Sequence, residues 1–248
     1  MRAPPLRQLL ESRGVESFTT ADAEGWFETH GPERVGAEVR RLRSEGMLTT
    51  PVRGFHVVSH GRPPRALRVL DAMMVHLGLR YAVGGRTAAR LHGAMVEADG
   101  VVHVRVETGR RAIEVSGERV EFFQMGALRA EDREHQGGVW VSRVHAVLWE
   151  LVVQASQRGG LERVVPLVRE LASRADPMEL TLAAAGVPLT CVARLGFILE
   201  HVGHRSEAGL LSPLVEEFFN TRVALDPHRD LRGAREDEHW QLFVNVDW

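Results

Sequence analysis

Apolar residues in the first 46 positions recur at helical spacing in three short runs. The first run follows two prolines that can open a helix and ends at Gly14. Thr19 or Thr20 is placed to cap the second run, and the third extends from Gly31-Pro32 to Gly46. The apolar members of the runs are Leu6, Leu9 and Leu10, then Trp26 and Phe27, then Val35, Val39 and Leu42. We therefore predict three short helices, the third of which buries a narrow apolar stripe.

Two β-prone runs follow the third helix. Residues 47–50 and 55–59 flank Pro51-Val52-Arg53-Gly54, whose composition is typical of a hairpin turn. Three helices followed by a hairpin is the order of elements in a winged helix-turn-helix. We therefore predict a winged helix-turn-helix DNA-binding domain over residues 1–62, joined by a proline-rich linker to a second domain over 65–248.

Strand patterns open the second domain. Residues 81–83 form a short apolar run that leads through Gly84-Gly85 into a helical pattern. Over 101–107 polar and apolar side chains alternate, so that His103 and Arg105 fall on the face opposite the valines. The predicted sheet occupies roughly 81–142 and also includes runs at 113–115 and 120–123.

The apolar period becomes helical after residue 143. Helices are expected near 144–157, 161–174, 177–186 and 189–203, with a final strand over 240–246. The predicted fold class is α+β, with an N-terminal winged helix-turn-helix followed by a larger mixed α/β domain. That larger domain is expected to contain a small sheet and a C-terminal helical bundle.

Composition narrows the chemistry that is possible. All 31 basic residues are arginine, which excludes a lysine Schiff base and the lysine of a Walker A motif. The whole chain carries a net charge of −2, but the stretch from Arg34 to Arg68 contains eight arginines and only two acids. Such a basic stretch fits an anionic partner, and charge alone leaves open the alternative of a solvated surface without one.

Three features of the sequence favour the cytoplasm. The single cysteine, Cys191, cannot form an internal disulfide and is expected to be a small buried apolar residue. The N-terminus lacks the apolar run of a signal peptide. The longest apolar stretch, around 146–155, is too short to span a bilayer and is interrupted by Glu150.

The third predicted helix carries a candidate DNA-reading face. The side opposite its apolar stripe is rich in arginine, which can contact guanine with two hydrogen bonds in the major groove. The hairpin turn offers a further cation for a phosphate or the minor groove, and two threonines offer backbone N–H groups to phosphates. The candidate DNA-binding residues are Thr19, Thr20, Arg34, Arg40, Arg41, Arg43, Ser44 and Arg53. The alternative is a solvated helix face stabilised by Glu38–Arg41 and similar pairs.

We predict no catalytic, cofactor or metal site. A Gly-Gly turn after a short strand also begins a nucleotidyltransferase fold, but the paired metal-binding carboxylates are missing. Asp99 is at a plausible distance, yet position 101 holds valine rather than a second acid. Gly84-Gly85 is therefore interpreted as a tight strand-to-helix turn. The twelve histidines show no recognisable ligand cluster and are expected to be exposed.

Segments along nearly the whole chain carry a family resemblance. They are FTTA at 18–21, VRRLRSEGML at 39–48, RGFHVV at 53–58, RYAVGGRTAARLHGA at 80–94, VHAVLWEL at 144–151, GGL at 159–161, RLGFILE at 194–200, LDP at 225–227 and WQLFVN at 240–245. In this order the segments resemble those of AbiEi-type antitoxins.

The resemblance implies an antitoxin of a type IV toxin–antitoxin or abortive-infection operon. In such proteins the winged helix binds inverted repeats in the operon promoter and represses transcription. The C-terminal domain counteracts a nucleotidyltransferase-like toxin, by a route that need not involve a stable complex. The larger domain is accordingly expected to be non-catalytic.

Two other functions remain open from the sequence. One is a stand-alone transcription regulator with a ligand- or partner-sensing C-terminal domain. The other is an enzyme such as a nuclease, which would need a cluster of acids on the sheet. The available acids are Glu97, Asp99, Glu107, Glu114 and Glu121, and none has a diagnostic spacing.

Overall fold

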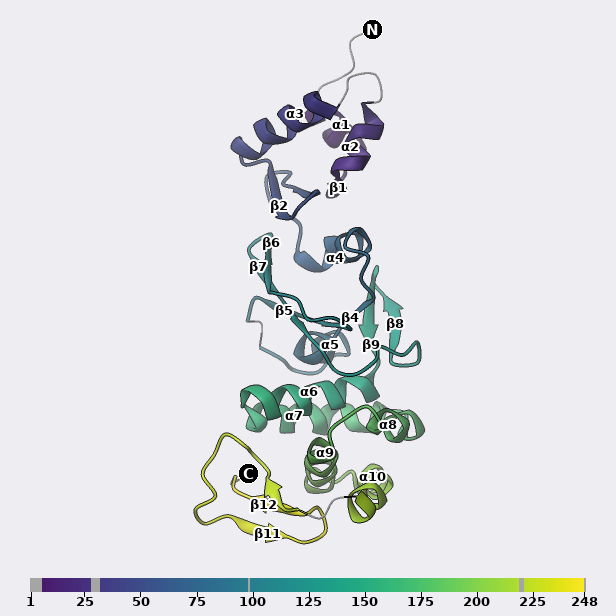
Figure 1. Cartoon of the computed structure of the whole chain (residues 1–248), viewed down its shortest axis with the longest axis vertical. Helices are drawn as coiled ribbons and strands as arrows, with labels where there is room; N and C mark the ends of the chain where they lie inside the picture. Colours follow the sequence, from purple (N-terminus) through teal and green to yellow (C-terminus); the bar gives the residue numbers. More distant parts are fainter. Residues whose placement is uncertain (1–5, 28–31, 98, 219–220, 248) are drawn as a thin grey trace.

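The computed structural model describes residues 6–27, 32–97, 99–218 and 221–247. Within these ranges the chain is a mixed α/β fold with ten α-helices and three sheets. The elements are stacked along one long axis, from the N-terminal helices at one end to a small C-terminal sheet at the other (Figure 1). Of the helices described, none combines the length and apolar character that a bilayer crossing requires.

The N-terminal part contains three helices on one face of a three-stranded sheet. Its elements are α1 (Leu6–Arg13), β1 (Ser17–Thr19), α2 (Thr20–Trp26), α3 (Pro32–Ser44), β2 (Leu48–Val52) and β3 (Phe55–Val58). The three predicted helices and the hairpin are confirmed, whereas β1, which pairs antiparallel with β3, was not predicted. The helices and the sheet enclose a core of Leu6, Leu10, Phe18, Ala23, Phe27, Val35, Leu42, Leu48 and Val58.

Helix α4 (Ala66–His76) packs against the N-terminal sheet from the side away from α1–α3 (Figure 1). Strand β3 is buried on both faces, because His56 and Val58 point toward the N-terminal helices while Phe55 and Val57 join the main core of the protein. The apolar core therefore runs without a break from this sheet into the larger part of the chain.

A six-stranded sheet forms the centre of the molecule. Its strands are β4 (Tyr81–Val83), β5 (Val101–Val106), β6 (Ile113–Val115), β7 (Glu118–Phe123), β8 (Arg133–Gln136) and β9 (Val139–Ser142), in the order β6-β7-β5-β4-β9-β8. The pairs β5–β7 and β4–β9 are parallel and the other pairs are antiparallel. Helix α4 lies on one side of this sheet, and α5 (Gly85–Leu91) and α6 (Val144–Arg158) lie on the other (Figure 1).

Helices and a second small sheet complete the chain. They are α7 (Leu161–Leu171), the 3₁₀ turn η1 (Ala172–Arg174), α8 (Pro177–Ala184), α9 (Leu189–His201), α10 (Arg205–Phe218), β10 (Val223–Ala224), β11 (Arg235–Asp237) and β12 (Leu242–Val244). The four predicted helices and the final strand are confirmed, and Cys191 is buried as expected. Helix α10 and strands β10 and β11 were not predicted.

A fully buried carboxylate joins the central sheet to α6. Glu150 accepts hydrogen bonds from the Gly85 N–H at 2.7 Å and from the Ser142 hydroxyl at 2.7 Å. Its other neighbour is the Arg105 guanidinium, whose Nη1 lies 3.5 Å from Glu150 Oε1. Arg105 Nη2 donates to the carbonyl oxygens of Met125 and Ala127, at 2.7 Å each. Burial raises the pKa of Glu150, and the nearby Arg105 charge opposes that shift.

A second carboxylate, Asp132, lies on the far side of the same guanidinium. Its Oδ2 is 3.6 Å from Arg105 Nη1, and its Oδ1 accepts from Arg129 and lies 3.6 Å from His145 Nε2. Burial alone would raise the pKa of Asp132, but the His145 ring and the Arg129 guanidinium outweigh burial and lower it to about 2. The cluster thus places two acids around one buried arginine.

Two sequence expectations about polar side chains are wrong. The alternation over β5 predicted His103 and Arg105 on a polar face, but they are only 9% and 2% exposed, because α5 and α6 cover that face. The histidines were expected to be exposed, yet His56, His103 and His145 are all buried. Periodicity identifies the two faces of a strand but does not reveal that a polar face will be covered and its charges paired.

The C-terminal sheet is held by one aromatic side chain packed on a glycine. Trp240 is 1% exposed, and its indole N–H donates to Glu200 Oε2 at 2.7 Å. A Cβ atom added at Gly196 of α9 would collide with the Trp240 ring. Only glycine at position 196 therefore allows the indole to lie against the helix backbone.

We predict that Gly196→Ala destabilises the protein by about 3 kcal/mol, the upper end of the range for an overpacked core. The control is Gly209→Ala in α10, where an added Cβ meets nothing within 4 Å. This control should stabilise the protein by about 0.5–1 kcal/mol through helix propensity. Chemical denaturation measures both values, and equal stability of the two variants would contradict the assigned packing.

Candidate nucleic-acid interface

The outer face of α3 is an exposed arginine surface. Val35 and Leu42 are buried against the N-terminal core, as the apolar stripe predicted, and Val39 is partly buried. The opposite face exposes Arg34, Arg40, Arg41, Arg43 and Ser44. Helix α3 lies at the N-terminal end of the long axis, away from α6–α10 (Figure 1). The arginine surface is therefore not covered by the larger part of the described chain.

Ion pairing divides these arginines into two kinds. Arg41 donates to Glu38 at 3.0 Å and to Glu45 at 2.8 Å, and these acids raise its pKa. Arg34, Arg40 and Arg43 form no ion pair with any residue that the structure describes. The predicted Glu38–Arg41 pair is thus present, and most of the uncompensated charge of α3 comes from the other three arginines.

The hairpin turn between β2 and β3 consists of Arg53 and Gly54. Gly54 has φ +78°, a left-handed conformation that favours glycine, and the Arg53 side chain is exposed. The Gly54 carbonyl accepts from the Thr20 N–H at 2.9 Å, and the Arg53 carbonyl accepts from His76 Nε2 of α4 at 2.9 Å. The turn is therefore fixed on one side by α2 and on the other by α4.

The two candidate threonines make contacts within the protein. Thr19 is the N-cap of α2, where its hydroxyl accepts from the Asp22 N–H at 3.0 Å and the Asp22 carboxylate accepts from the Thr19 N–H at 2.7 Å. The Thr20 N–H is used by Gly54. Both N–H groups that the sequence analysis offered to phosphates are thus already engaged, and the Asp22 carboxylate lies beside them.

His56 connects the elements beneath this surface, a role that the sequence analysis missed. Its Nδ1 lies 3.0 Å from Thr50 Oγ1 and its Nε2 lies 3.1 Å from Thr20 Oγ1, so one ring joins α2, β2 and β3. Burial lowers the pKa of His56, and the positive charges of Arg43 and His76 add to that effect. A polar residue inside an apolar strand run was the only signal in the sequence.

The Gly84-Gly85 turn is the place where the sequence analysis looked for paired metal-binding carboxylates. The Gly84-Gly85 turn between β4 and α5 is confirmed, and the carboxylate beside it is Glu150, which is fully buried. Among the residues that the structure describes, no group of three His, Cys, Asp or Glu side chains is placed to hold a metal ion.

Comparisons with known proteins agree with this architecture. Residues 81–201 match the family model of the AbiEi antitoxin C-terminal domain. The crystal structure of the RV2827C protein from Mycobacterium tuberculosis is similar with a TM-score of 0.73 at 16% identity, covering 97% of this chain and 92% of that one. At that identity the likeness shows a shared fold.

A weaker structural match adds no argument. The solution structure of the antibiotic-resistance factor ANT(2'')-Ia aligns with a TM-score of 0.36 at 12% identity, over 56% of this chain and 96% of that one. No curated protein matches the chain.

We predict that the His56 ring titrates with a midpoint below 6.5, and that Arg43→Ala raises that midpoint because it removes a nearby positive charge. The unfolded chain binds this proton more tightly, so His56 makes folding less favourable as pH falls below 6.5. Proton NMR of the imidazole measures the midpoint, with Arg40→Ala as the control. An Arg43→Ala midpoint equal to that of the unsubstituted protein would contradict the placement of Arg43.

Proposed function

We propose, from the match of residues 81–201 to the AbiEi antitoxin C-terminal domain, that the chain is a DNA-binding antitoxin. It represses its own type IV toxin–antitoxin operon and counteracts a nucleotidyltransferase-like toxin. The observation that carries the DNA-binding part is the exposed arginine face of α3, where three of the four arginines pair with no acid that the structure describes. The family match carries the antitoxin part.

The N-terminal part is proposed to be a winged helix-turn-helix within residues 1–62, with the antitoxin domain over 65–248. Helix α3 serves as the recognition helix in the major groove, and the β2–β3 hairpin serves as the wing. The element order, the exposed face of α3 and the fixed hairpin turn support this assignment. The five residues before α1 lie outside the described structure.

The contacts of each candidate residue suggest how the roles divide. Arg34, Arg40 and Arg43 are proposed to supply most of the charge for base and phosphate contacts, and Arg53 contacts DNA from the wing. Ser44 offers an uncharged hydroxyl, which in the structure donates to the Arg41 carbonyl. Arg41 would have to break its ion pairs with Glu38 and Glu45 before it could bind DNA, so it is proposed to contribute less to DNA affinity. Thr19 and Thr20 are proposed to hold α2 and the wing in place rather than to bind phosphates directly.

The first test is operator binding by the full chain. Arg40→Ala should weaken binding to the duplex upstream of the chain's own gene by about 5-fold to 150-fold, which corresponds to 1–3 kcal/mol for one good base contact. The double substitution Arg40→Ala/Arg41→Ala should weaken it further. Fluorescence anisotropy measures both, and the logarithm of affinity should fall with the logarithm of salt concentration by about 0.9 per neutralised phosphate.

The matched control is Arg232→Ala, which removes an exposed arginine from the C-terminal part of the chain. It should leave operator affinity unchanged. If the double variant binds as tightly as the unsubstituted protein, α3 does not read the operator and the proposed orientation fails.

The second test separates toxin neutralisation from repression. The full chain and its Arg40→Ala/Arg41→Ala variant are each expressed from an unrelated promoter together with the adjacent nucleotidyltransferase-like gene, and growth is measured. Both should rescue growth, because neutralisation is assigned to the larger domain. Rescue by the unsubstituted chain alone would assign neutralisation to the N-terminal part. The full chain is used because Phe55 and Val57 belong to the main core, so truncation at residue 65 would expose apolar surface.

A further inference from the structure

Two adjoining cavities flank the beginning of α7, far along the chain from the arginine surface of α3. The inner cavity has a volume of about 140 Å³ and is lined by polar side chains of α5, β5 and α6 as well as by the Gly159-Gly160 turn. The outer cavity has a volume of about 430 Å³ and opens beside α7. The two share Arg86, Arg163 and Leu167 in their walls.

The inner cavity has an excess of positive charge. Three arginines line it, and two of them have partners: Arg86 lies 3.0 Å from Asp99, and Arg158 lies 2.9 Å from Glu121. Arg163 forms no ion pair with any described residue. The walls of the inner cavity contain no acidic side chain among those described, whereas the outer cavity includes Glu97 and Glu162. An anion would therefore be attracted to the inner end.

Two polar side chains of the inner cavity lack a hydrogen-bond partner at one atom. Gln154 Nε2 is buried without a partner. His103 is only 9% exposed, and its Nδ1 lies 3.2 Å from Thr87 Oγ1, which leaves its Nε2 without a described partner. Buried polar atoms are normally satisfied, so the Gln154 nitrogen is an exception, while His103 Nε2 on the cavity wall can accept a hydrogen bond from, or donate one to, a group that enters the cavity.

The positive end of a helix lies at the same place. Gly159 and Gly160 have φ +83° and +87°, and both line the inner cavity just before α7 begins at Leu161. The first N–H groups of a helix have no acceptor within that helix and carry its positive dipole end. Helix α7 is 11 residues long. Gly160, Arg163 and Val164 line the inner cavity, so the positive end of the α7 dipole lies at its wall.

We propose that the inner cavity binds the phosphate group of a small phosphorylated molecule of nucleotide size. The phosphate accepts hydrogen bonds from Arg163 and Arg158, beside the turn at Gly159-Gly160. The remainder of the molecule lies in the outer cavity, whose apolar walls are Met95, Val96, Pro166 and Leu167. Met95 is 87% exposed, and a ligand in the outer cavity would cover it. The site does not depend on the proposed DNA binding.

The experiment is a titration of the full chain, followed through the backbone amide signals of Gly159, Gly160 and Leu161 and the ring signals of His103. Inorganic phosphate, adenosine monophosphate and adenosine are the three probes, at constant ionic strength. Phosphate and the nucleotide should both shift these signals, the nucleotide at a concentration at least tenfold lower. Adenosine should leave the two glycine signals unchanged, because it lacks the anion.

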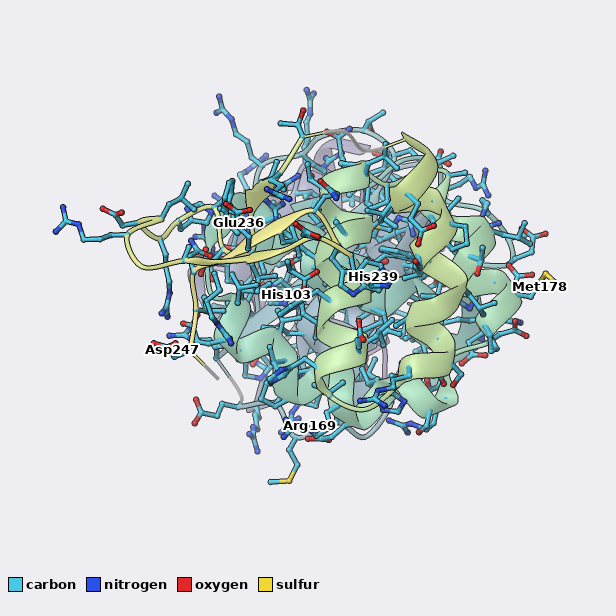
Figure 2. All side chains as sticks on the ribbon, turned by 90° about the horizontal axis from the view of Figure 1, so that it is seen from below. His103, Arg169, Met178, Glu236, His239 and Asp247 are labelled. Carbon is cyan, nitrogen blue, oxygen red and sulfur yellow. The ribbon has the colours of Figure 1, made fainter. Side chains whose placement is uncertain are left out.

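The test variant is Arg163→Ala, with Arg169→Ala of the same helix as the matched control. Arg169 is exposed and lies at the edge of the molecule in Figure 2, whereas the labelled His103 lies well inside its outline. Arg163→Ala should weaken nucleotide binding at least tenfold, and Arg169→Ala should leave it unchanged. The side chain of Arg163 is exposed enough for the variant to fold, and Arg163→Glu provides a second substitution with a larger expected loss.

Three outcomes would overturn the proposal. Absence of shifts with both phosphate and the nucleotide at high millimolar concentration excludes the inner site. Equal binding by Arg163→Ala and the unsubstituted protein shows that the anion lies elsewhere. Equal affinity for phosphate and the nucleotide removes the assigned role of the outer cavity.

Discussion

The buried contact between Glu150 and Arg105 is the constraint on which the larger domain depends. A fully buried carboxylate costs several kcal/mol unless it is paired and hydrogen-bonded, and Glu150 meets both conditions through residues from three different elements. The arrangement also explains the turn after β4, because a Cβ at Gly84 would collide with Glu150 and Phe123. Loss of either charge would leave the other buried, so the contact fixes how α6 docks on the sheet more than it adds net stability.

A second constraint joins the two ends of the fold. Helix α4 contacts the N-terminal sheet on one side and the central sheet on the other, and His76 of α4 donates to the carbonyl of Arg53 in the hairpin turn. The proposed wing is therefore not a projecting loop. The position of the hairpin turn depends on that of α4. At the beginning of α4, the Ala66 N–H donates to the Glu118 carboxylate of β7 at 2.6 Å. A rearrangement of the central sheet would thus move α4 and, with it, the hairpin turn of the proposed DNA-binding surface.

The parts of the fold that the sequence predicted correctly are those controlled by local chemistry. The threonine cap of α2 and the proline start and glycine end of α3 were visible because each acts on neighbouring backbone groups. Helix α10 was missed because Gly209 and Pro213 interrupt its pattern, although its contacts with α9 stabilise it. The burial of His103 and the engagement of the Thr20 N–H were also invisible, because both depend on residues distant in sequence. The sequence therefore predicted correctly that the arginine side chains of α3 are exposed. It did not predict that the N–H groups of Thr19 and Thr20 are already hydrogen-bonded within the protein.

Because the chain has no lysine, arginine serves both as a buried partner of carboxylates and as an exposed cation. The contacts of each side chain show which of these two roles it has. Arg105 is buried between two carboxylates and two backbone carbonyl oxygens, and a planar guanidinium with several donors suits this set of neighbours better than a lysine ammonium would. Arg40 is exposed without a described acid, which leaves its charge for a partner outside the chain. Arg41 lies between these extremes, because the carboxylates of Glu38 and Glu45 compete with any phosphate for the same donors. The eight arginines between Arg34 and Arg68 therefore overstate the positive charge that is available to a DNA duplex. The ion pairs of each arginine determine how much of its charge remains available.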